Sequence, residues 1–165
     1  MNRRSFLSVC SIGGTSLLFA SSKQNARILS NEQFLTIQTV QQHMFPDNNI
    51  IPSAKTFRAT KFLIETISHH TFDRDIRKIV IGGATELQNR ENNKFLTYNS
   101  HKIEKALRSY EESSYGSNWL NQIMILSLEA LMSDPIYGGN YNQLGWDSLK
   151  TEGGTPRPKK RYIEL

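Results

Sequence analysis

Residues 117–132 read SNWLNQIMILSLEALM, and this stretch decides the fold class. Its apolar side chains fall on nearly every side of a helical wheel, and a helix that is hydrophobic all round is typical of a buried central element. We therefore predict a central helix capped by Ser117. Its predicted buried positions are Trp119, Leu120, Ile123, Met124, Leu126, Leu128, Leu131 and Met132.

Four further helices are predicted upstream of this central helix. Their starts are marked by serine or aspartate, and apolar residues then recur at three- and four-residue spacing. The expected helices cover residues 30–44, 53–68, 73–87 and 100–110. The pair Gly82–Gly83 weakens the third helix, and residues 78–83 (KIVIGG) could instead form a short strand, although no partner strand is visible. The sequence predicts a compact all-α bundle of about five helices with an irregular C-terminal segment rich in glycine and aromatic residues.

Composition indicates one globular domain preceded by a leader and followed by a polar tail. The chain has 165 residues, of which 38% are hydrophobic and 21% charged, and this balance is too polar for an integral membrane protein. The formal net charge is +5, and no basic stripe with interleaved aromatic residues supports nucleic-acid binding. We expect a leader at 1–22, a helical domain at 23–150 and a basic tail at 151–165.

The N-terminal stretch MNRRSFLSVCSIGGTSLLFASSK has the layout of an export signal. Arg3 and Arg4, followed by Phe6 and Leu7, resemble the twin-arginine signature, which directs already folded proteins to the export channel. The alternative is an ordinary signal for unfolded chains whose basic start contains two arginines. Either signal predicts a periplasmic protein.

The only cysteine, Cys10, lies in this leader. Cleavage after Ala20 or Ser22 would remove it and leave a chain of net charge +3 without a thiol. We therefore expect no disulfide, no cysteine-ligated metal and no thiol nucleophile in the mature protein.

The remaining sequence shows no catalytic constellation. The glycine pairs never form the dinucleotide-binding pattern GxGxxG, and no phosphate-cradling loop is present. None of the four histidines has a carboxylate at a useful metal-binding offset: His43, His69, His70 and His101. We expect no catalytic residue, no metal and no cofactor bound by this chain.

The tail combines prolines with basic residues. Pro156 and Pro158 keep it extended, and its basic residues are Arg157, Lys159, Lys160 and Arg161. It is predicted to be solvated or to lie along an acidic partner or an anionic lipid surface.

Residues 134–146, DPIYGGNYNQLGW, follow the central helix and are expected to be irregular. Pro135 should end the helix, and Gly138–Gly139–Asn140 should turn the chain through positive φ values. The aromatic residues of this segment could grip a partner, or they could merely cover the end of the bundle.

The motif DPIYGGN, followed by Gly145–Trp146, resembles the gluconate 2-dehydrogenase subunit 3 family. Residues 43–54, HMFPDNNIIPSA, are similar to the Phe-Pro segment and Pro-Gly-Ala helix start of that family, with Ser53 in place of the glycine. One departure follows Trp146, where the family often continues to an aromatic-Pro-Gly sequence and this chain has Thr151-Glu152-Gly153.

The resemblance implies the small, or gamma, subunit of a periplasmic FAD-dependent sugar or alcohol dehydrogenase. A large subunit of the glucose-methanol-choline oxidoreductase type would hold FAD and oxidise the substrate, and a cytochrome c subunit with haem c would usually pass the electrons to quinone. The small subunit, itself without a catalytic site, would bind the folded large subunit and escort it through twin-arginine export.

Aromatic residues on a rigid turn are typical of interface hot spots. We therefore expect Tyr137, Asn140 and Trp146 to contact the partner, Tyr141 to be the next candidate contact, and Gly138 and Gly139 to give the turn its shape. The alternative from another class is a stand-alone exported helical protein that serves as an enzyme, a scaffold or a haem- or metal-binding module.

Overall fold

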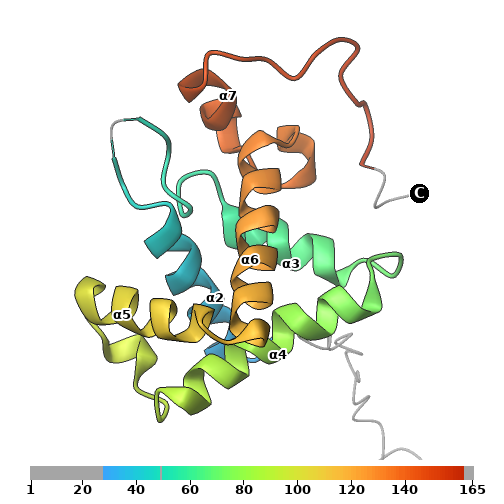
Figure 1. Cartoon of the computed structure of the whole chain (residues 1–165). Coiled ribbons are helices and arrows are strands. Elements are labelled where there is room, and N and C mark those ends of the chain that lie inside the picture. The colour runs from blue at the N-terminus through green and yellow to red at the C-terminus, as the bar shows by residue number, and fades with distance from the viewer. Residues whose placement is uncertain (1–27, 49, 162–165) are drawn as a thin grey trace, which may run out of the picture.

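The structure is a computed structural model that describes residues 28–48 and 50–161, and every regular element within them is helical (Figure 1). The five long helices are α2 (Asn31–Met44), α3 (Ala59–Ser68), α4 (Arg74–Arg90), α5 (Ser100–Glu111) and α6 (Ser114–Met132). Shorter helical turns are η1 (Phe95–Thr97), η2 (Pro135–Tyr137), η3 (Tyr141–Gln143) and α7 (Leu144–Ser148).

The prediction of an all-α bundle is therefore confirmed, and the alternative strand at residues 78–83 is wrong because these residues lie inside α4. The leader residues Arg3, Arg4, Phe6 and Leu7 lie outside the described residues. Within the described part of the chain, no helix combines the length and the apolar character that crossing a bilayer requires.

Short polar side chains fix where most helices begin. Ser30 and Gln33 form the predicted capping box of α2, since each side chain bonds the backbone N–H of the other. Asp73 caps α4 as predicted. The central helix α6 begins three residues before the predicted cap, because the hydroxyl of Ser113 accepts the N–H of Gly116 at 3.0 Å and so takes the capping role expected of Ser117.

Helix α3 begins later than the sequence predicted, at Ala59 rather than near Ser53. The ring of Phe57 is fully buried and packs edge-on against Phe45, with 5.5 Å between the ring centroids. Arg58 then takes a left-handed backbone conformation with φ 64°, which a helix cannot contain. A tertiary contact outweighs the local helical pattern here.

Helix α6 is the central element. It contacts every other α-helix of the described chain, and Figure 1 shows it in front of α2 and α3, with α4 and α5 crossing near its beginning and α7 beyond its end. The main core gathers around it from α2 to α6. Its fully buried members include Ile37, Val40, Leu63, Ile67, Val80, Ala84, Leu87, Phe95, Tyr110, Trp119 and Ile123.

A buried glutamine joins three of these helices. Gln41 on α2 is fully buried; its amide nitrogen donates to Ser127 Oγ on α6 at 2.9 Å. Its amide oxygen accepts from Thr60 Oγ1 on α3 at 2.7 Å. Because buried polar groups are costly unless bonded, this set of bonds fixes how α2, α3 and α6 sit against one another.

One side of α6 differs from the prediction. Leu128 and Met132 were predicted to be buried, but their exposed fractions are 45% and 42%, and that of the neighbouring Ile125 is 40%. Met124 is only partly buried. The prediction was wrong for this side because no element of the described chain crosses the outer face of α6 near its end (Figure 1).

Candidate partner-binding segment

The segment after α6 is a tight reversal of the chain at residues 133–146. Asp134 Oδ1 accepts the N–H of Ile136 at 3.0 Å, and Pro135 occupies the first turn of η2. Gly138 follows with φ 96°, in the region that favours glycine. Pro135 and Gly138 thus end the helix and turn the chain as the sequence predicted, whereas the positive φ predicted for Gly139 is wrong.

The segment then lies directly on the backbone of α6. A Cβ atom on Gly139 would collide with the carbonyl oxygen of Ala130, and one on Gly145 would collide with that of Leu131. Both glycines are buried. Only residues without a side chain allow this close approach, so the glycines set the shape of the segment.

Asn140 holds the two ends of the segment together. It is fully buried, with a left-handed φ of 41°. Its Nδ2 donates to the carbonyl of Ser133 at 3.0 Å, and its Oδ1 accepts the N–H of Gly145 at 2.8 Å. Asparagine is among the few residues that tolerate this backbone region, so one side chain supplies both the conformation and the cross-link.

Trp146, near the end of the segment, packs its indole against the end of α6. Only 4% of its surface is exposed, and its Nε1–H donates to the carbonyl of Met132 at 2.8 Å. That carbonyl belongs to the last turn of α6, where carbonyls lack a partner within the helix. The indole therefore covers the end of α6 and satisfies one of its free carbonyls.

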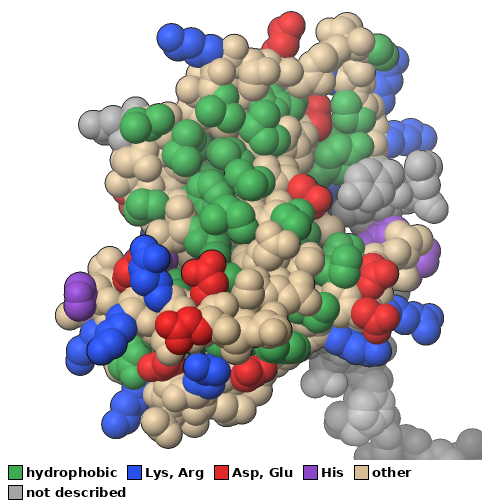
Figure 2. All heavy atoms as spheres, viewed as in Figure 1, with side chains coloured by type: hydrophobic (Ala, Val, Ile, Leu, Met, Phe, Trp, Pro, Cys, Tyr) green, Lys and Arg blue, Asp and Glu red, His purple; other side chains and the backbone are tan. Residues whose placement is uncertain are grey.

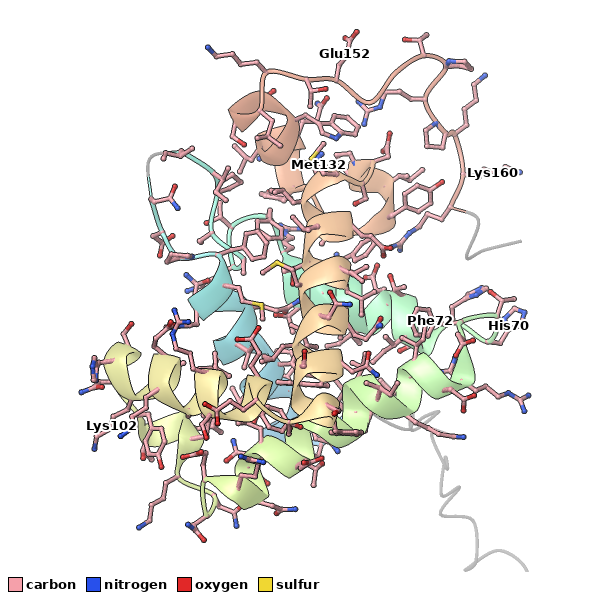
Figure 3. All side chains as sticks on the ribbon, in the orientation of Figure 1. His70, Phe72, Lys102, Met132, Glu152 and Lys160 are labelled. Carbon is pink, nitrogen blue, oxygen red and sulfur yellow. The ribbon has the colours of Figure 1, made fainter. Side chains whose placement is uncertain are left out.

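The tail folds back over the same segment (Figure 3, from the labelled Glu152 to Lys160). Arg157 Nε donates to Asp134 Oδ2 at 2.8 Å, and its guanidinium lies 4.9 Å from the ring centroid of Trp146. This arginine, together with the N–H of Ile136, lowers the pKa of the Asp134 carboxyl. Farther along, Arg161 forms an ion pair with Glu65 of α3.

A comparison with protein families finds a match that spans every helix of the described chain. The family model described as gluconate 2-dehydrogenase subunit 3 covers residues 31–154, from the first residue of α2 to beyond α7. The chain belongs to the gluconate 2-dehydrogenase subunit 3 family. Searches of the curated proteins and of the solved structures find no significant match.

Membership in the gluconate 2-dehydrogenase subunit 3 family confirms the resemblance drawn from DPIYGGN and Gly145–Trp146. It implies that the chain is a subunit of a multi-subunit dehydrogenase complex. The match ends at Gly154, so the two arginine contacts of the tail lie beyond the part that the family shares.

In this family member the six residues predicted to bind a partner lie together at the end of α6, but they differ in solvent exposure. Gly139, Asn140 and Trp146 are buried within the chain, and Tyr137 and Gly138 are partly buried. Tyr141 is exposed, and the guanidinium of Arg58 lies over its ring at 3.4 Å from the centroid. That these residues contact a partner stays a prediction. In this prediction, Tyr141 is the exposed residue that a partner can reach, and the buried residues hold Tyr141 in position.

Sequence reasoning missed the arginine contacts of the segment. Arg157 and Arg161 were predicted to be solvated or to face a partner, and the structure pairs them with Asp134 and Glu65 instead. Nothing in the sequence indicated which carboxylates the arginines would reach, because Arg161 and Glu65 are 96 residues apart.

The histidines lie away from this segment. His43 Nε2 is 2.7 Å from Glu104 Oε2, between α2 and α5. His69 and His70 lie in the turn after α3 (Figure 3), where their rings are 4.4 Å apart. Over residues 28–48 and 50–161, no three histidine, cysteine or acidic side chains are grouped so that they could hold a metal ion. The segment after α6 can shape a surface and cover the end of a helix.

Proposed function

We propose that this chain is the non-catalytic small subunit of a periplasmic FAD-dependent sugar or alcohol dehydrogenase. In this proposal it binds the folded flavoprotein large subunit, of the glucose-methanol-choline oxidoreductase type, and escorts that subunit through twin-arginine export. FAD belongs to the large subunit, and haem c to a cytochrome subunit where the complex has one.

The observation that carries the proposal is the combination of two features on one chain. A domain of the gluconate 2-dehydrogenase subunit 3 family occupies residues 31–154. Ahead of it stands a leader with Arg3–Arg4 and Phe6–Leu7, of the type that directs folded cargo to export. A folded subunit with such a leader can carry across the membrane a bound partner that has no signal of its own.

The irregular segment after α6 supports the binding role. Asn140, Asn142 and Gln143 all have positive φ values, of 41°, 53° and 65°. Few residues other than glycine and asparagine adopt this region readily, and backbone conformations of this kind concentrate at functional sites. A segment held in this conformation by Asn140 and Trp146 is suited to present Tyr141 in one fixed position.

The proposal is tested by co-purification from the native host. The full-length chain, with a C-terminal affinity tag, is recovered from the periplasmic fraction, and bound proteins are identified by mass spectrometry and flavin absorbance. We expect a flavin-containing subunit at equal stoichiometry. Changing Arg3 and Arg4 to lysine should leave the pair assembled in the cytoplasm, because the twin-arginine pathway requires the arginines whereas an ordinary export signal needs only positive charge.

The control is Arg27→Lys, the same exchange outside the twin-arginine motif, which should not affect export. A tagged chain that reaches the periplasm without any flavoprotein would contradict the escort role and favour the stand-alone protein. Continued export of the double lysine variant would instead contradict the twin-arginine route alone.

A further inference from the structure

Helix α6 carries an exposed apolar stripe made of Ile125, Leu128 and Met132. These residues are spaced by three and four positions, which places them on one face of the helix. Their exposed fractions lie between 40% and 45%. We refer to these three residues as the α6 stripe.

The stripe belongs to a larger apolar surface. Met44, Ile51 and Met124 are partly buried and pack on the small core that also contains Ala130 and Leu131 of α6. Figure 2 shows hydrophobic side chains gathered over the upper half of α6 and the segments beside it, whereas charged side chains surround its lower half. Contiguous apolar surface of this kind is typical of an interaction site.

The polarity of the exposed face changes half-way along α6. Toward the beginning of the helix, its exposed positions are Ser114, Tyr115, Ser117, Asn118 and Asn121, of which only Tyr115 carries a large apolar group. After residue 124 the exposed positions are the α6 stripe and Glu129. A helix face that contacts only solvent is normally polar over its whole length. The apolar second half of this face therefore indicates a contact other than with solvent.

Glu129 adds a charge to this surface. It is exposed in part and lies one turn from Ile125 and next to Leu128, and desolvation by its surroundings raises the pKa of its carboxyl. Over the described residues, no lysine, arginine or histidine lies within ion-pair distance of it. A carboxylate at the border of an apolar area would be stabilised by a cation brought by a partner.

The charge distribution argues against a second copy of this chain as that partner. Helix α6 (Ser114–Met132) contains no lysine and no arginine. Two copies that met through this helix would bring the two Glu129 carboxylates to the same interface with no cation from either helix. A different protein, with its own basic residue beside an apolar surface, fits better.

We propose that the α6 stripe and Glu129 form the docking surface for the large subunit of the dehydrogenase complex, through an apolar segment of that subunit that carries a lysine or arginine opposite Glu129. This inference rests on the proposed function, since it names the surface by which the chain holds its cargo. It is distinct from the residues that hold the segment after α6 in shape, because the stripe is exposed whereas Gly139, Asn140 and Trp146 are buried.

The test uses the co-purification described above with substitutions in the mature chain. Leu128→Glu places a charge in the middle of the stripe and should reduce the recovered large subunit at least about tenfold, as expected for a central interface residue. The matched control is Leu35→Glu, the same change at a leucine that is 44% exposed near the beginning of α2, at the other end of the molecule from α7 (Figure 1). The control should leave recovery unchanged.

A second pair of variants tests the charge. Glu129→Lys should reduce recovery of the large subunit more than Glu129→Gln does, because it turns attraction into repulsion. Glu112→Lys, at an exposed glutamate just after α5, is the control and should have no effect. Thermal unfolding of each purified chain, followed by circular dichroism, verifies that all the variants are folded.

The possible outcomes separate the two proposals. If the wild-type chain retains the large subunit and Leu128→Glu retains as much, the docking surface is wrong while the escort role stands. If the wild-type chain retains no flavoprotein, both proposals fail. A wild-type chain that is dimeric by light scattering, and monomeric after Leu128→Glu, would show that a second copy covers the stripe and would overturn this inference.

Discussion

At the scale of single residues, Asn140 is the most informative position of the molecule. It is fully buried, its backbone is left-handed, and its amide bonds both the Ser133 carbonyl and the Gly145 N–H. Asn140→Ala would leave both backbone groups unbonded and place an alanine at positive φ. We expect a loss of about 2–4 kcal/mol in the free energy of unfolding, measured by urea denaturation of the purified chain.

Asn142 provides a matched control for this prediction. It also has a positive φ, of 53°, but it is exposed, and its side chain forms no hydrogen bond to any other described residue. Asn142→Ala should therefore cost only the backbone strain, at most about 1–2 kcal/mol. Equal losses for the two variants would show that the hydrogen bonds of Asn140 contribute nothing, against the role assigned to it.

At the scale of elements, the crossing of α4 and α6 depends on one glycine of a pair. A Cβ atom on Gly83 would overlap the indole of Trp119, whose Nε1–H donates to the carbonyl of Val80 at 2.9 Å. The nearest atom to a Cβ on Gly82 is only the hydroxyl of Tyr115, at the end of a half-exposed side chain. A side chain can therefore be accommodated at position 82 but not at position 83.

We therefore expect opposite effects from the same substitution. Gly83→Ala should lower the free energy of unfolding by about 2–3 kcal/mol, because the helices must move apart or the indole must turn. Gly82→Ala should be neutral or should stabilise the chain by up to about 1 kcal/mol through the higher helix propensity of alanine. Thermal unfolding of both variants checks this; a stabilising Gly83→Ala would contradict the close crossing.

The helix starts and this glycine pair show which features of the helices could be predicted from the sequence. Local signals such as the capping box at Ser30 and the cap at Asp73 gave correct helix starts, because both partners of each hydrogen bond lie within a few residues. The start of α3 could not be predicted, because the burial of Phe57 against Phe45 is a tertiary contact. The low helix propensity of glycine weakened the prediction of a helix at Gly83. The reason for a glycine at this position is the indole of Trp119, which lies where a side chain would be.

The apolar pattern of α6 has a related limit. Hydrophobic residues on all sides of a helix indicate that every side avoids water, but not whether the chain itself or another protein provides the cover. Leu128 and Met132 fitted the pattern of a buried helix and are nevertheless exposed in the single chain. In a family of subunits, such a disagreement between pattern and burial is expected where a partner binds.

At the scale of the whole molecule, the candidate site could be located from the sequence but its internal contacts could not. The motif DPIYGGN and Gly145–Trp146 identified the family, and that their segment binds a partner stays a prediction. The bonds from Asn140 to Ser133 and from Trp146 to Met132 depend on which carbonyls remain free where α6 ends. The tail contacts depend on the path of a chain that returns across the fold, which no local pattern encodes.

The attachment of that tail should depend on pH through Asp134. Because Arg157 lowers the pKa of this carboxyl, the ionised form is favoured in the folded chain. The contact should therefore stabilise the folded state fully above the ordinary carboxyl pKa of about 3.9, and this contribution should disappear as the pH falls through the lower pKa of folded Asp134. The Asp134 side chain is 11% exposed but that of Arg157 is 42% exposed, so salt should screen the pair in part.

The Nε–H of Arg157 gives a direct measurement, since it is the group that donates to Asp134 at 2.8 Å. Its proton resonance, followed by NMR in the purified chain, should titrate with a midpoint below the ordinary carboxyl pKa. Asp134→Asn should abolish the titration while its amide oxygen can still cap η2. Glu65→Gln, which removes the other arginine pair, should leave the titration unchanged. A midpoint at the ordinary value, or one that persists in Asp134→Asn, would mean that Arg157 is not bound to Asp134, and the tail would then be free to leave the segment at any pH.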